Sequence, residues 1–245
     1  MPPALRLYTD LAPWWPLLSA PADYAVEATS FLEILDLRPR EATPTLLELG
    51  SGGGNLASHL KAHFRVTLSD LAPAMLDVSR RLNPELEHVH GDMRALRLGR
   101  TFDVVLIHDA IMYCTTADDV RAALGTAVAH CRDGGTVLVA PDRVRETFEP
   151  GTSTGGEDGA DGRSLRYMDW TLDPDPSDTT TETLYAIVLR EASGDVRVEL
   201  DRHVEGLFAE AEWLAWFAGA GLRTRVVRDA WDRHVFVGVK EPTPA

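Results

Sequence analysis

The chain has 245 residues, of which 38 are Asp or Glu and 24 are Lys or Arg, so its formal net charge is −14. Because 44% of the residues are hydrophobic and 25% are charged, the chain can bury a sizeable core, and this composition excludes disorder throughout. The acidic balance argues against DNA or RNA as a partner, since no cluster of Lys and Arg offsets the long-range repulsion of phosphates. We expect a globular protein without a nucleic-acid partner.

Cys114 and Cys131 are too few for a disulfide framework, and their separation matches no zinc or redox motif, so we expect two small core residues in a reducing compartment. The N-terminus lacks a basic segment followed by an apolar run, and no stretch approaches the length of a bilayer span. No His/Asp/Glu cluster has the spacing of metal ligands. These features predict a cytoplasmic protein with no metal ion and no membrane partner, either a monomer or a homodimer.

The first 142 residues alternate between helix and strand patterns. An N-terminal cap over residues 1–40 contains an aromatic lead-in and a helix over 24–37 that ends before Pro39. Strands are predicted at 45–50, 66–70, 86–92, 102–109 and 136–140, with helices after residue 54, over 73–82, and from Thr116 to the glycine pair at 134–135. This alternation predicts an α/β fold, with a parallel sheet covered on both faces, in a core over 45–142.

The pattern changes after Pro141. Residues 143–208 are predicted as a loop and hairpin insert, in which the glycine-rich segment 151–162 forms a mobile loop and 173–178 an exposed acidic turn. Two strand-like runs at 184–190 and 196–208 flank a turn signal at 193–195, which predicts the hairpin. A helix and two closing strands follow over 209–245. We expect a single domain over the whole chain.

The most informative segment is Glu48-Leu-Gly-Ser-Gly-Gly-Gly54 at the first strand-to-helix turn. In open α/β sheets, ligands bind outside the carboxyl ends of the strands, and glycines allow the backbone to approach them closely. A dinucleotide fingerprint needs glycine at its first, third and sixth positions, but the sixth position counted from Gly50 is Asn55. The turn therefore predicts a nucleotide-like ligand other than a dinucleotide.

This turn resembles the first motif of class I S-adenosylmethionine-dependent methyltransferases, and further matches follow in order. The resemblance implies that Asp70 accepts both ribose hydroxyls, that Asp92 meets the adenine amino group with Met93 against the ring, and that His108-Asp109 lies beneath the methionine part of the cofactor. The cofactor-binding residues implied in this way are Glu48, Gly50, Ser51, Gly52, Gly54, Asp70, Leu71, Asp92, Met93, His108 and Tyr8.

The resemblance also implies a Rossmann-like, mostly parallel sheet of seven strands, the last one antiparallel. The aromatic N-terminal segment, the hairpin and the ending Val235–Val239 are most similar to bacterial small-molecule methyltransferases of the sugar N-methyltransferase and glycine N-methyltransferase type. The implied function is methyl transfer from S-adenosylmethionine to an amine or hydroxyl of a small metabolite. Two alternatives stay open: a non-catalytic S-adenosylmethionine-binding regulatory protein, and a nicotinamide-dependent oxidoreductase.

A neutral amine needs no strong base, whereas a hydroxyl does, and histidine is the side chain best suited to that task near neutral pH. The candidates are His108, at a strand end, and His203; Asp109 is a candidate for orienting His108 or an amine. His203 and Glu205 share one face of a strand, where they would either line the pocket or remain half-exposed strand residues. The candidate acceptor-binding residues are Trp15, Tyr24, Tyr113, His203 and Glu205, although aromatic clusters also occur as plain core.

Overall fold

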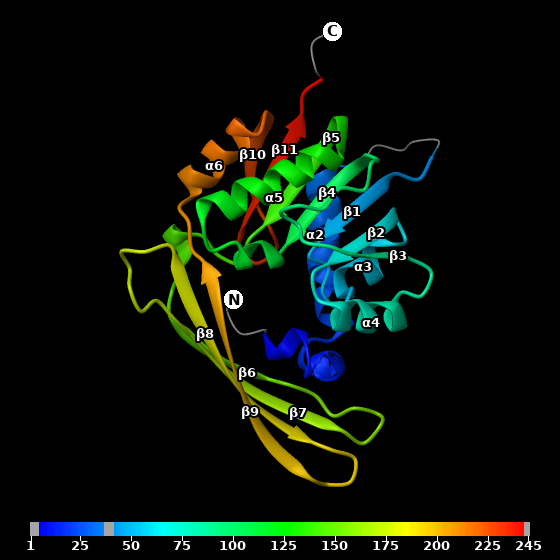
Figure 1. Cartoon of the computed structure of the whole chain (residues 1–245), viewed down its shortest axis with the longest axis vertical. Coiled ribbons are helices and arrows are strands. Elements are labelled where there is room, and N and C mark those ends of the chain that lie inside the picture. Colours follow the sequence, from blue (N-terminus) through cyan, green and yellow to red (C-terminus); the bar gives the residue numbers. More distant parts are fainter. Residues whose placement is uncertain (1–4, 37–41, 243–245) are drawn as a thin grey trace.

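The structure is a computed structural model that describes residues 5–36 and 42–242. It contains a seven-stranded sheet with helices packed on it and a four-stranded sheet of consecutive strands. Figure 1 shows the four-stranded sheet below the larger one, with the N-terminal helices between the two. The ligand edge predicted from the sequence therefore faces a second layer of structure.

The large sheet has the strand order β10-β11-β5-β4-β1-β2-β3. All neighbouring strands are parallel except that β11 runs antiparallel to both β5 and β10. This confirms the predicted doubly wound, mostly parallel sheet of seven strands with an antiparallel last strand. The bounds are β1 (Thr45–Leu49), β2 (Arg65–Asp70), β3 (Glu87–His90), β4 (Phe102–His108), β5 (Cys131–Ala140), β10 (Leu222–Arg228) and β11 (His234–Lys240).

The helices begin largely where the sequence predicts them. One helix starts at Pro73, and another is capped by Thr116, whose Oγ1 accepts a hydrogen bond from the Asp119 backbone N–H at 3.1 Å. The helix predicted over 24–37 is observed over Ala25–Leu35, and Pro39 lies outside the described residues. In the described part of the chain, no helix is long and apolar enough to cross a bilayer. The bounds are α1 (Trp15–Leu18), α2 (Ala25–Leu35), α3 (Asn55–Leu60), α4 (Pro73–Leu82), α5 (Ala117–His130) and α6 (Glu210–Gly219), with 3-10 turns at Arg6–Tyr8, Ala12–Trp14 and Pro21–Tyr24 within the predicted N-terminal cap.

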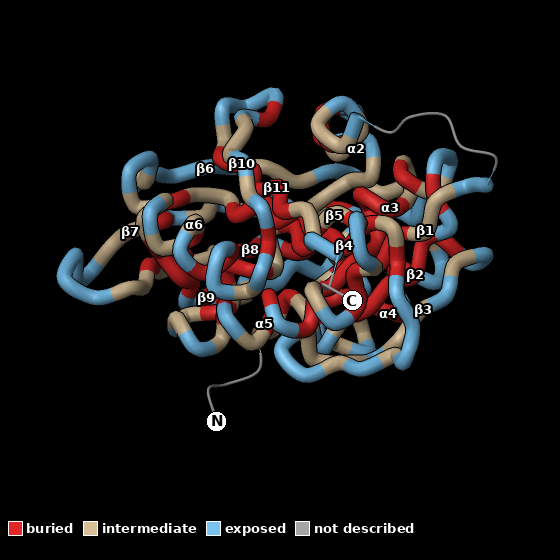
Figure 2. The backbone as a smooth tube through the Cα atoms, turned by 90° about the horizontal axis from the view of Figure 1, so that it is seen from above, coloured by how far each residue is buried: buried red, intermediate tan, exposed pale blue. Residues whose placement is uncertain are grey.

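The core of the large sheet lies on both of its faces, as the continuous apolar run of β4 predicts. Val105 and Ile107 pack into one cluster with α5 and α6, while Val104 and Leu106 pack into the other with α2 and α3. Figure 2 shows this buried centre in red. Both cysteines are buried free thiols, which confirms the expectation that they are core residues.

The prediction that the glycine pair at 134–135 ends the preceding helix is wrong. The helix ends at His130, and both glycines lie inside β5. Gly134 has a φ of 70°, and the pairing of β4 with β5 shifts register between Phe102 and Val104. The glycines therefore mark a strand irregularity, which is a common place for glycine within a sheet.

The four-stranded sheet corrects a second prediction. Its order is β6-β7-β8-β9, with bounds Gly151–Gly155, Ser164–Leu172, Thr180–Arg190 and Val196–Gly206. The β8–β9 hairpin is confirmed, but residues 151–155 form a strand instead of the predicted mobile loop, and β7 was not predicted. The side chains of β6 are mostly exposed, so its sequence shows no alternation of apolar and polar residues. Backbone hydrogen bonds to β7 define it as a strand.

Candidate active site

The glycine turn lies at the carboxyl end of β1. Gly50 and Ser51 donate backbone hydrogen bonds to the Ser69 carbonyl at 2.8 and 2.9 Å, which ties the turn to β2. Gly50 has a φ of 77°, and a β-carbon added there would lie 2.4 Å from the Cβ of Ala110. The turn therefore packs so closely on the end of β4 that the position requires glycine.

Asp70 closes the other side of this turn from the end of β2. Its Oδ2 accepts the Gly52 N–H at 2.7 Å, and its Oδ1 accepts the Ala72 N–H at 2.8 Å. Burial raises the pKa of the Asp70 carboxyl, and these N–H groups act in the opposite direction. The next residue, Leu71, leaves 58% of its side chain exposed at this edge. A carboxylate oxygen has two lone pairs, so both oxygens retain capacity for hydroxyl donors.

Asp92 and Met93 follow β3 at the same edge of the sheet. The guanidinium of Arg94 pairs with the Asp92 carboxylate at 2.7 Å and lowers its pKa. The terminal methyl group of Met93 would lie 2.9 Å from a β-carbon at Gly50, so its side chain rests against the glycine turn. The residues implied for ribose and adenine thus lie together around one turn.

Two buried polar atoms in the turn have no hydrogen-bond partner among the described residues: Glu48 Oε2 and Ser51 Oγ. Burial raises the pKa of Glu48 to about 8. Such orphaned groups are unfavourable unless a ligand satisfies them. Together with the Asp70 carboxylate and the apolar Leu71 and Met93, they fit S-adenosylmethionine, which carries hydroxyls, an adenine ring and a charged amino acid.

A charged network lies beside this turn at the end of β4. His108 Nε2 is 2.9 Å from Glu27 Oε1 and 2.8 Å from Asp109 Oδ1, and both His108 and Glu27 are buried. Burial disfavours the imidazolium, but the two carboxylates prevail and hold the pKa of His108 well above its usual value. His108 is therefore a cation between two anions.

Arg233, in the turn between β10 and β11, supplies the second cation. Its guanidinium pairs with Glu27 and with Asp229, the latter at 2.7 Å, and lies 3.8 Å from Asp109. Neither Glu27 nor Arg233 was predicted. Glu27 carried a signal, because it falls on the apolar stripe of α2, between Tyr24 and Phe31 at helical spacing; the position of Arg233 depends on sheet pairing alone.

Asp142, at the end of β5, completes this group and was not predicted either. Arg233 Nη1 lies 3.6 Å from its carboxylate. Burial and the nearby charge of Asp109 raise the pKa of Asp142 well above its usual range, whereas the charges of His108 and Arg233 lower that of Asp109. The pKa values of these two neighbouring carboxyls therefore differ widely. Asp109 is ionised, and Asp142 is the one that keeps a proton.

Three ligand-type atoms, from Glu27, His108 and Asp109, lie within 4.8 Å of one another. Such a group is able to hold a metal ion in principle. Here the Arg233 guanidinium already bonds to Glu27, so the protein itself provides positive charge for these carboxylates. We interpret the group as an ion-pair network.

A pocket of about 330 Å³ opens next to this network. Asp109 borders it in a strained backbone conformation, with φ 31° and ψ −47°, a combination that non-glycine residues adopt mainly where function requires it. Of the predicted acceptor-binding residues, the pocket contains Trp15 and Tyr24. Its lining residues are Trp15, Leu18, Ser19, Asp23, Tyr24, Glu27, Asp109, Tyr167, Trp231 and Arg233.

Three of the remaining predicted residues, Tyr8, Tyr113 and His203, form a hydrogen-bonded chain with Asp201, which was not predicted, on the inner face of the four-stranded sheet. Tyr8 Oη is 2.7 Å from Tyr113 Oη, Tyr113 Oη is 2.7 Å from His203 Nδ1, and His203 Nε2 is 3.0 Å from Asp201 Oδ2. The alternative of half-exposed strand residues is wrong, because His203 and Glu205 retain 1% and 6% exposure. Glu205 accepts a hydrogen bond from Thr183 at 3.1 Å.

Tyr8 connects this chain to the pocket. Its ring packs against Trp15, with centroids 5.7 Å apart, and against Tyr113 edge-on at 5.6 Å. Because Trp15 lines the pocket and also lies against Gly53 of the glycine turn, the chain, the pocket and the turn adjoin one another. A doubly wound sheet of this strand order, with these groups at its carboxyl edge, has the fold and site of a class I methyltransferase.

Comparison with known proteins agrees with this class. Residues 46–135 match the family model described as a methyltransferase domain. Over 220 residues the chain is 31% identical to a dTDP-3-amino-3,4,6-trideoxy-alpha-D-glucopyranose N,N-dimethyltransferase of Streptomyces venezuelae, which covers 89% of this chain and 91% of the relative. The chain belongs to the S-adenosylmethionine-dependent methyltransferases.

Solved structures support the same assignment. The crystal structure of DesVI from Streptomyces venezuelae superposes with a TM-score of 0.82 at 28% identity, covering 95% of this chain and 99% of that one. CalS10, an amino pentose methyltransferase from Micromonospora echinaspora solved with S-adenosylmethionine bound, gives a TM-score of 0.74 at 26% identity, with 89% and 91% coverage. The methyl donor of this enzyme is S-adenosylmethionine.

Proposed function

We propose that this enzyme methylates the amino group of a nucleotide-linked amino sugar. The observation that carries this proposal is the pocket, which combines the carboxylate of Asp109 with the guanidinium of Arg233 and several aromatic rings. A carboxylate suits an amine, a guanidinium suits a diphosphate, and aromatic rings suit sugar and base faces. The names of the curated relatives, which act on dTDP-linked amino sugars, support the same acceptor class.

In this proposal Asp109 orients the acceptor amine. It lines the pocket, and the charges of His108 and Arg233 keep its pKa low, so it is a carboxylate that accepts an N–H donor. His108 is charged and lies between Glu27 and Asp109, so it has no free lone pair with which to act as a base. Its role is to position Asp109.

Arg233 and Trp231 also line the pocket. The guanidinium lies over the Trp231 ring, 4.9 Å from its centroid, which fixes the direction of the arginine side chain. A diphosphate entering here would compete with Glu27 for the guanidinium. Trp231 retains 49% exposure, which leaves its ring available to a ligand.

S-adenosylmethionine supplies an electrophilic methyl group on a sulfonium. The main task of the protein is then to hold the amine in line with that group, and proximity of this kind is worth about 7–11 kcal/mol. The glycine turn and Asp70 fix the donor side, and Asp109 fixes the acceptor side. The strained backbone of Asp109 is consistent with that positioning role.

We further propose that the Tyr8–Tyr113–His203–Asp201 chain takes the proton from the amine. If Asp201 accepts from His203 Nε2–H, then Nδ1 accepts from Tyr113, and Tyr113 accepts from Tyr8. A proton delivered to Tyr8 moves each hydroxyl proton one step along and ends on His203, where Asp201 stabilises the imidazolium. His203→Gln removes the proton acceptor at the end of the chain and should lower kcat/KM for the amine; an unchanged kcat/KM would remove this role.

The acceptor class is tested by incubating the enzyme and S-adenosylmethionine with a dTDP-linked 3-amino sugar and a dTDP-linked 4-amino sugar. Mass spectrometry should detect one or two added methyl groups on one of them. The matched control is the same amino sugar without its nucleotide, which should react much more slowly. Equal rates for both would contradict the nucleotide requirement, and a hydroxylated acceptor methylated in preference would contradict the amine.

Two further expectations belong to this proposal. The two cysteines are buried free thiols, which is consistent with a cytoplasmic enzyme. The net charge of −14 is consistent with the absence of a nucleic-acid partner. Fractionation and a nucleic-acid binding assay test these two points directly.

A further inference from the structure

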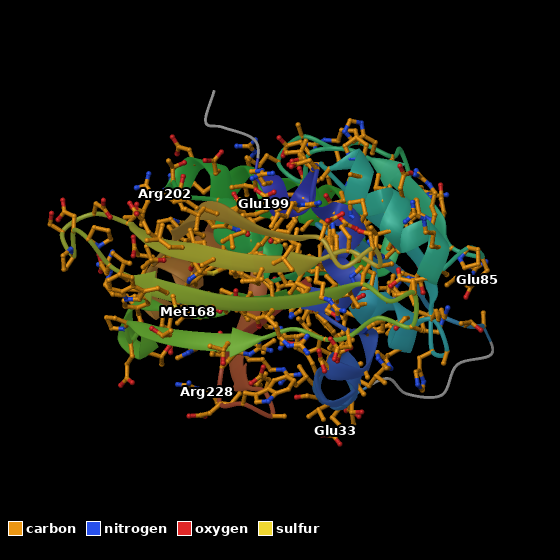
Figure 3. All side chains as sticks on the ribbon, turned by 90° about the horizontal axis from the view of Figure 1, so that it is seen from below. Glu33, Glu85, Met168, Glu199, Arg202 and Arg228 are labelled. Carbon is orange, nitrogen blue, oxygen red and sulfur yellow. The ribbon has the colours of Figure 1, made fainter. Side chains whose placement is uncertain are left out.

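The inner face of the four-stranded sheet changes character along its strands. Figure 3 shows these strands from their outer side, with Met168 on the near face. On the inner side, toward the β8–β9 turn, the buried side chains are apolar, and Leu165 and Leu189 pack with Leu7 of the N-terminal segment. At the other end of the same face the buried side chains are polar: Thr171, Thr181, Thr183, His203 and Glu205. Buried polar groups are costly unless they are hydrogen-bonded, so the partners of this polar end need to be identified.

A chain of hydrogen bonds holds Glu205 at the polar end. The hydroxyls of Thr171 and Thr183 are 3.1 Å apart, and Thr183 Oγ1 donates to Glu205 Oε2 at 3.1 Å. Arg143, which follows β5, donates from Nη2 to the same carboxylate oxygen at 3.3 Å. The carboxylate of Glu205 therefore fixes the place of the Arg143 guanidinium.

The Arg143 guanidinium has donors to spare. It carries five N–H groups, and among the described residues its one hydrogen bond is the bond to Glu205, although only 22% of its side chain is exposed. Thr181, which lies opposite Glu205 in the β8–β9 pair, has a buried hydroxyl with no partner in the described part of the chain. The polar end is thus left with unsatisfied groups that a polar ligand would complete.

Asp142 connects Arg143 to the acceptor side of the pocket. It precedes Arg143 in the chain, its carboxyl is hydrogen-bonded to Asp109, and it interacts electrostatically with both Arg143 and Glu205. Asp109 itself lines the pocket. The side chain of Asp142 retains 34% exposure, so a ligand that reaches Asp109 also reaches Asp142. A carboxyl that donates to Asp109 still has lone pairs with which to accept a hydrogen bond.

These groups select a neutral hydroxyl. Arg143 is already paired with Glu205, so an anion would gain less here than an unpaired guanidinium would offer. A methylene group would leave the spare donors of Arg143 unsatisfied, and sites of this kind discriminate strongly against a ligand that lacks the hydrogen-bonding group. A hydroxyl donates one hydrogen bond and accepts others, which suits Asp142 and Arg143 together.

We propose that Asp142 and Arg143 bind a hydroxyl on a ring carbon next to the acceptor amine. The hydroxyl donates to Asp142 and accepts from Arg143, and Glu205 is the positioning residue for Arg143. The nitrogen and oxygen on neighbouring ring carbons lie about one hydrogen-bond length apart when they are gauche, as do the hydrogen-bonded carboxyls of Asp109 and Asp142. This inference rests on the proposed function, in which Asp109 receives the amine, and adds that the acceptor is a vicinal amino alcohol.

The test uses the dTDP-linked 3-amino sugar and the dTDP-linked 4-amino sugar, each compared with an analogue in which hydrogen replaces the hydroxyls next to the amine. For the amino sugar that the enzyme methylates, kcat/KM should exceed that of its deoxygenated analogue by at least about 100-fold. Equal values for the two members of that pair overturn this proposal and leave the proposed function standing. Methylation of no member of either pair overturns the proposed function, and this proposal with it.

Variants assign the preference to these residues. Arg143→Met should reduce the preference for the hydroxylated sugar by about 10–100-fold, because it removes a charge-assisted hydrogen bond. Asp142→Leu should reduce it similarly, whereas Asp142→Asn keeps a carbonyl oxygen for the hydroxyl and an N–H group for Asp109 and should retain most of it. Arg121→Met, at an exposed ion-paired arginine of α5, is the matched control and should leave the preference unchanged.

The ratio of the two kcat/KM values is the readout, because a loss of folded protein lowers both values equally and leaves the ratio unchanged. Glu205→Gln is the gentler second variant: it keeps the size of the side chain, loosens Arg143 and should reduce the ratio by about three- to tenfold. The dissociation constant of S-adenosylhomocysteine, measured by calorimetry, shows that each variant is folded. A ratio that Arg143→Met and Glu205→Gln both leave at the wild-type value overturns the proposal.

Discussion

The cofactor side and the acceptor side of this active site are built in different ways. Most of the cofactor side comes from one stretch, residues 48–93, in which the binding residues lie at or just after the ends of β1, β2 and β3. The acceptor side combines Glu27 from α2, Asp109 just after β4 and Arg233 from the β10–β11 turn, almost the whole length of the chain apart. The first is a property of local strand-turn-helix units, and the second exists only when the complete chain has folded.

This difference predicts that the two sides can be damaged separately. Variants in the glycine turn should weaken cofactor binding and leave acceptor recognition intact once cofactor is saturating. Variants in the ion-pair network should weaken acceptor recognition and leave cofactor binding intact. The following predictions test that separation, beginning with the largest expected effect.

Gly50→Ala should abolish cofactor binding. The new β-carbon would lie 2.4 Å from the Cβ of Ala110 in a backbone conformation that disfavours any side chain. By calorimetry, we expect the dissociation constant for S-adenosylhomocysteine to rise at least about 100-fold. Gly125→Ala is the control, because this helical glycine of α5 has open space around it and should gain about 0.5–1 kcal/mol of stability. Equal cofactor affinity in both variants would contradict the tight turn.

Asp70→Asn should weaken binding of the same ligand by about 10–100-fold, because charge-assisted hydrogen bonds contribute about 1.5–3 kcal/mol. Asp92→Asn should have a smaller effect, since Arg94 already occupies much of that carboxylate. Calorimetric titration of both variants gives the ranking. The reverse order would mean that the adenine side, and not the ribose side, dominates recognition.

Asp109→Asn should lower kcat/KM for the acceptor by about 10–100-fold while the cofactor dissociation constant stays within about threefold. Asparagine has nearly the shape of aspartate, so the substitution removes the charge without adding bulk at this strained position. Asp118→Asn, at an exposed residue of α5, is the control. A loss confined to cofactor affinity would show that Asp109 belongs to the cofactor side of the site.

Glu48 should make the ligand-free enzyme less stable at alkaline pH. Burial raises its folded pKa to about 8, so the folded state holds this proton more tightly than the unfolded chain does. The resulting stability is complete below the ordinary pKa and is lost as pH rises to about 8. Urea unfolding at pH 6 and pH 8.5 should show a loss that Glu48→Gln reduces by roughly 1–3 kcal/mol. Identical pH dependence in both proteins would show that Glu48 ionises normally.

Tyr8→Phe should have the smallest effect. It removes the hydroxyl that bonds to Tyr113 but keeps the ring against Trp15. The substitution also interrupts the proposed proton chain at its first member. Because a neutral amine needs no strong base, turnover should still fall only about two- to fivefold, the loss expected from one neutral hydrogen bond of about 0.5–1.5 kcal/mol. Trp15→Ala removes a pocket wall and should raise the acceptor KM more. If neither variant changes turnover or cofactor affinity, the N-terminal segment is only a structural cover.

The sequence alone determined the order of elements in the large sheet and the residues around the glycine turn. Apolar periodicity and glycine spacing are local signals, and parallel strands bring their carboxyl ends to one edge without further information. For this reason the strand pattern is sufficient to assign Asp70, Asp92 and Asp109 to that edge. Residues such as Arg233 have no neighbouring motif, so neither pattern nor resemblance assigns them.

Only the tertiary structure decided the acceptor side and the second sheet. His108 is held as a cation by Glu27 and Asp109, and Arg233 pairs with Glu27, through contacts between residues up to 206 positions apart. The edge strand β6 carries no apolar period because its side chains are mostly exposed, so backbone pairing with β7 places it. Local chemistry specifies a strand-end turn, whereas an ion-pair network and a sheet edge depend on which distant segments meet.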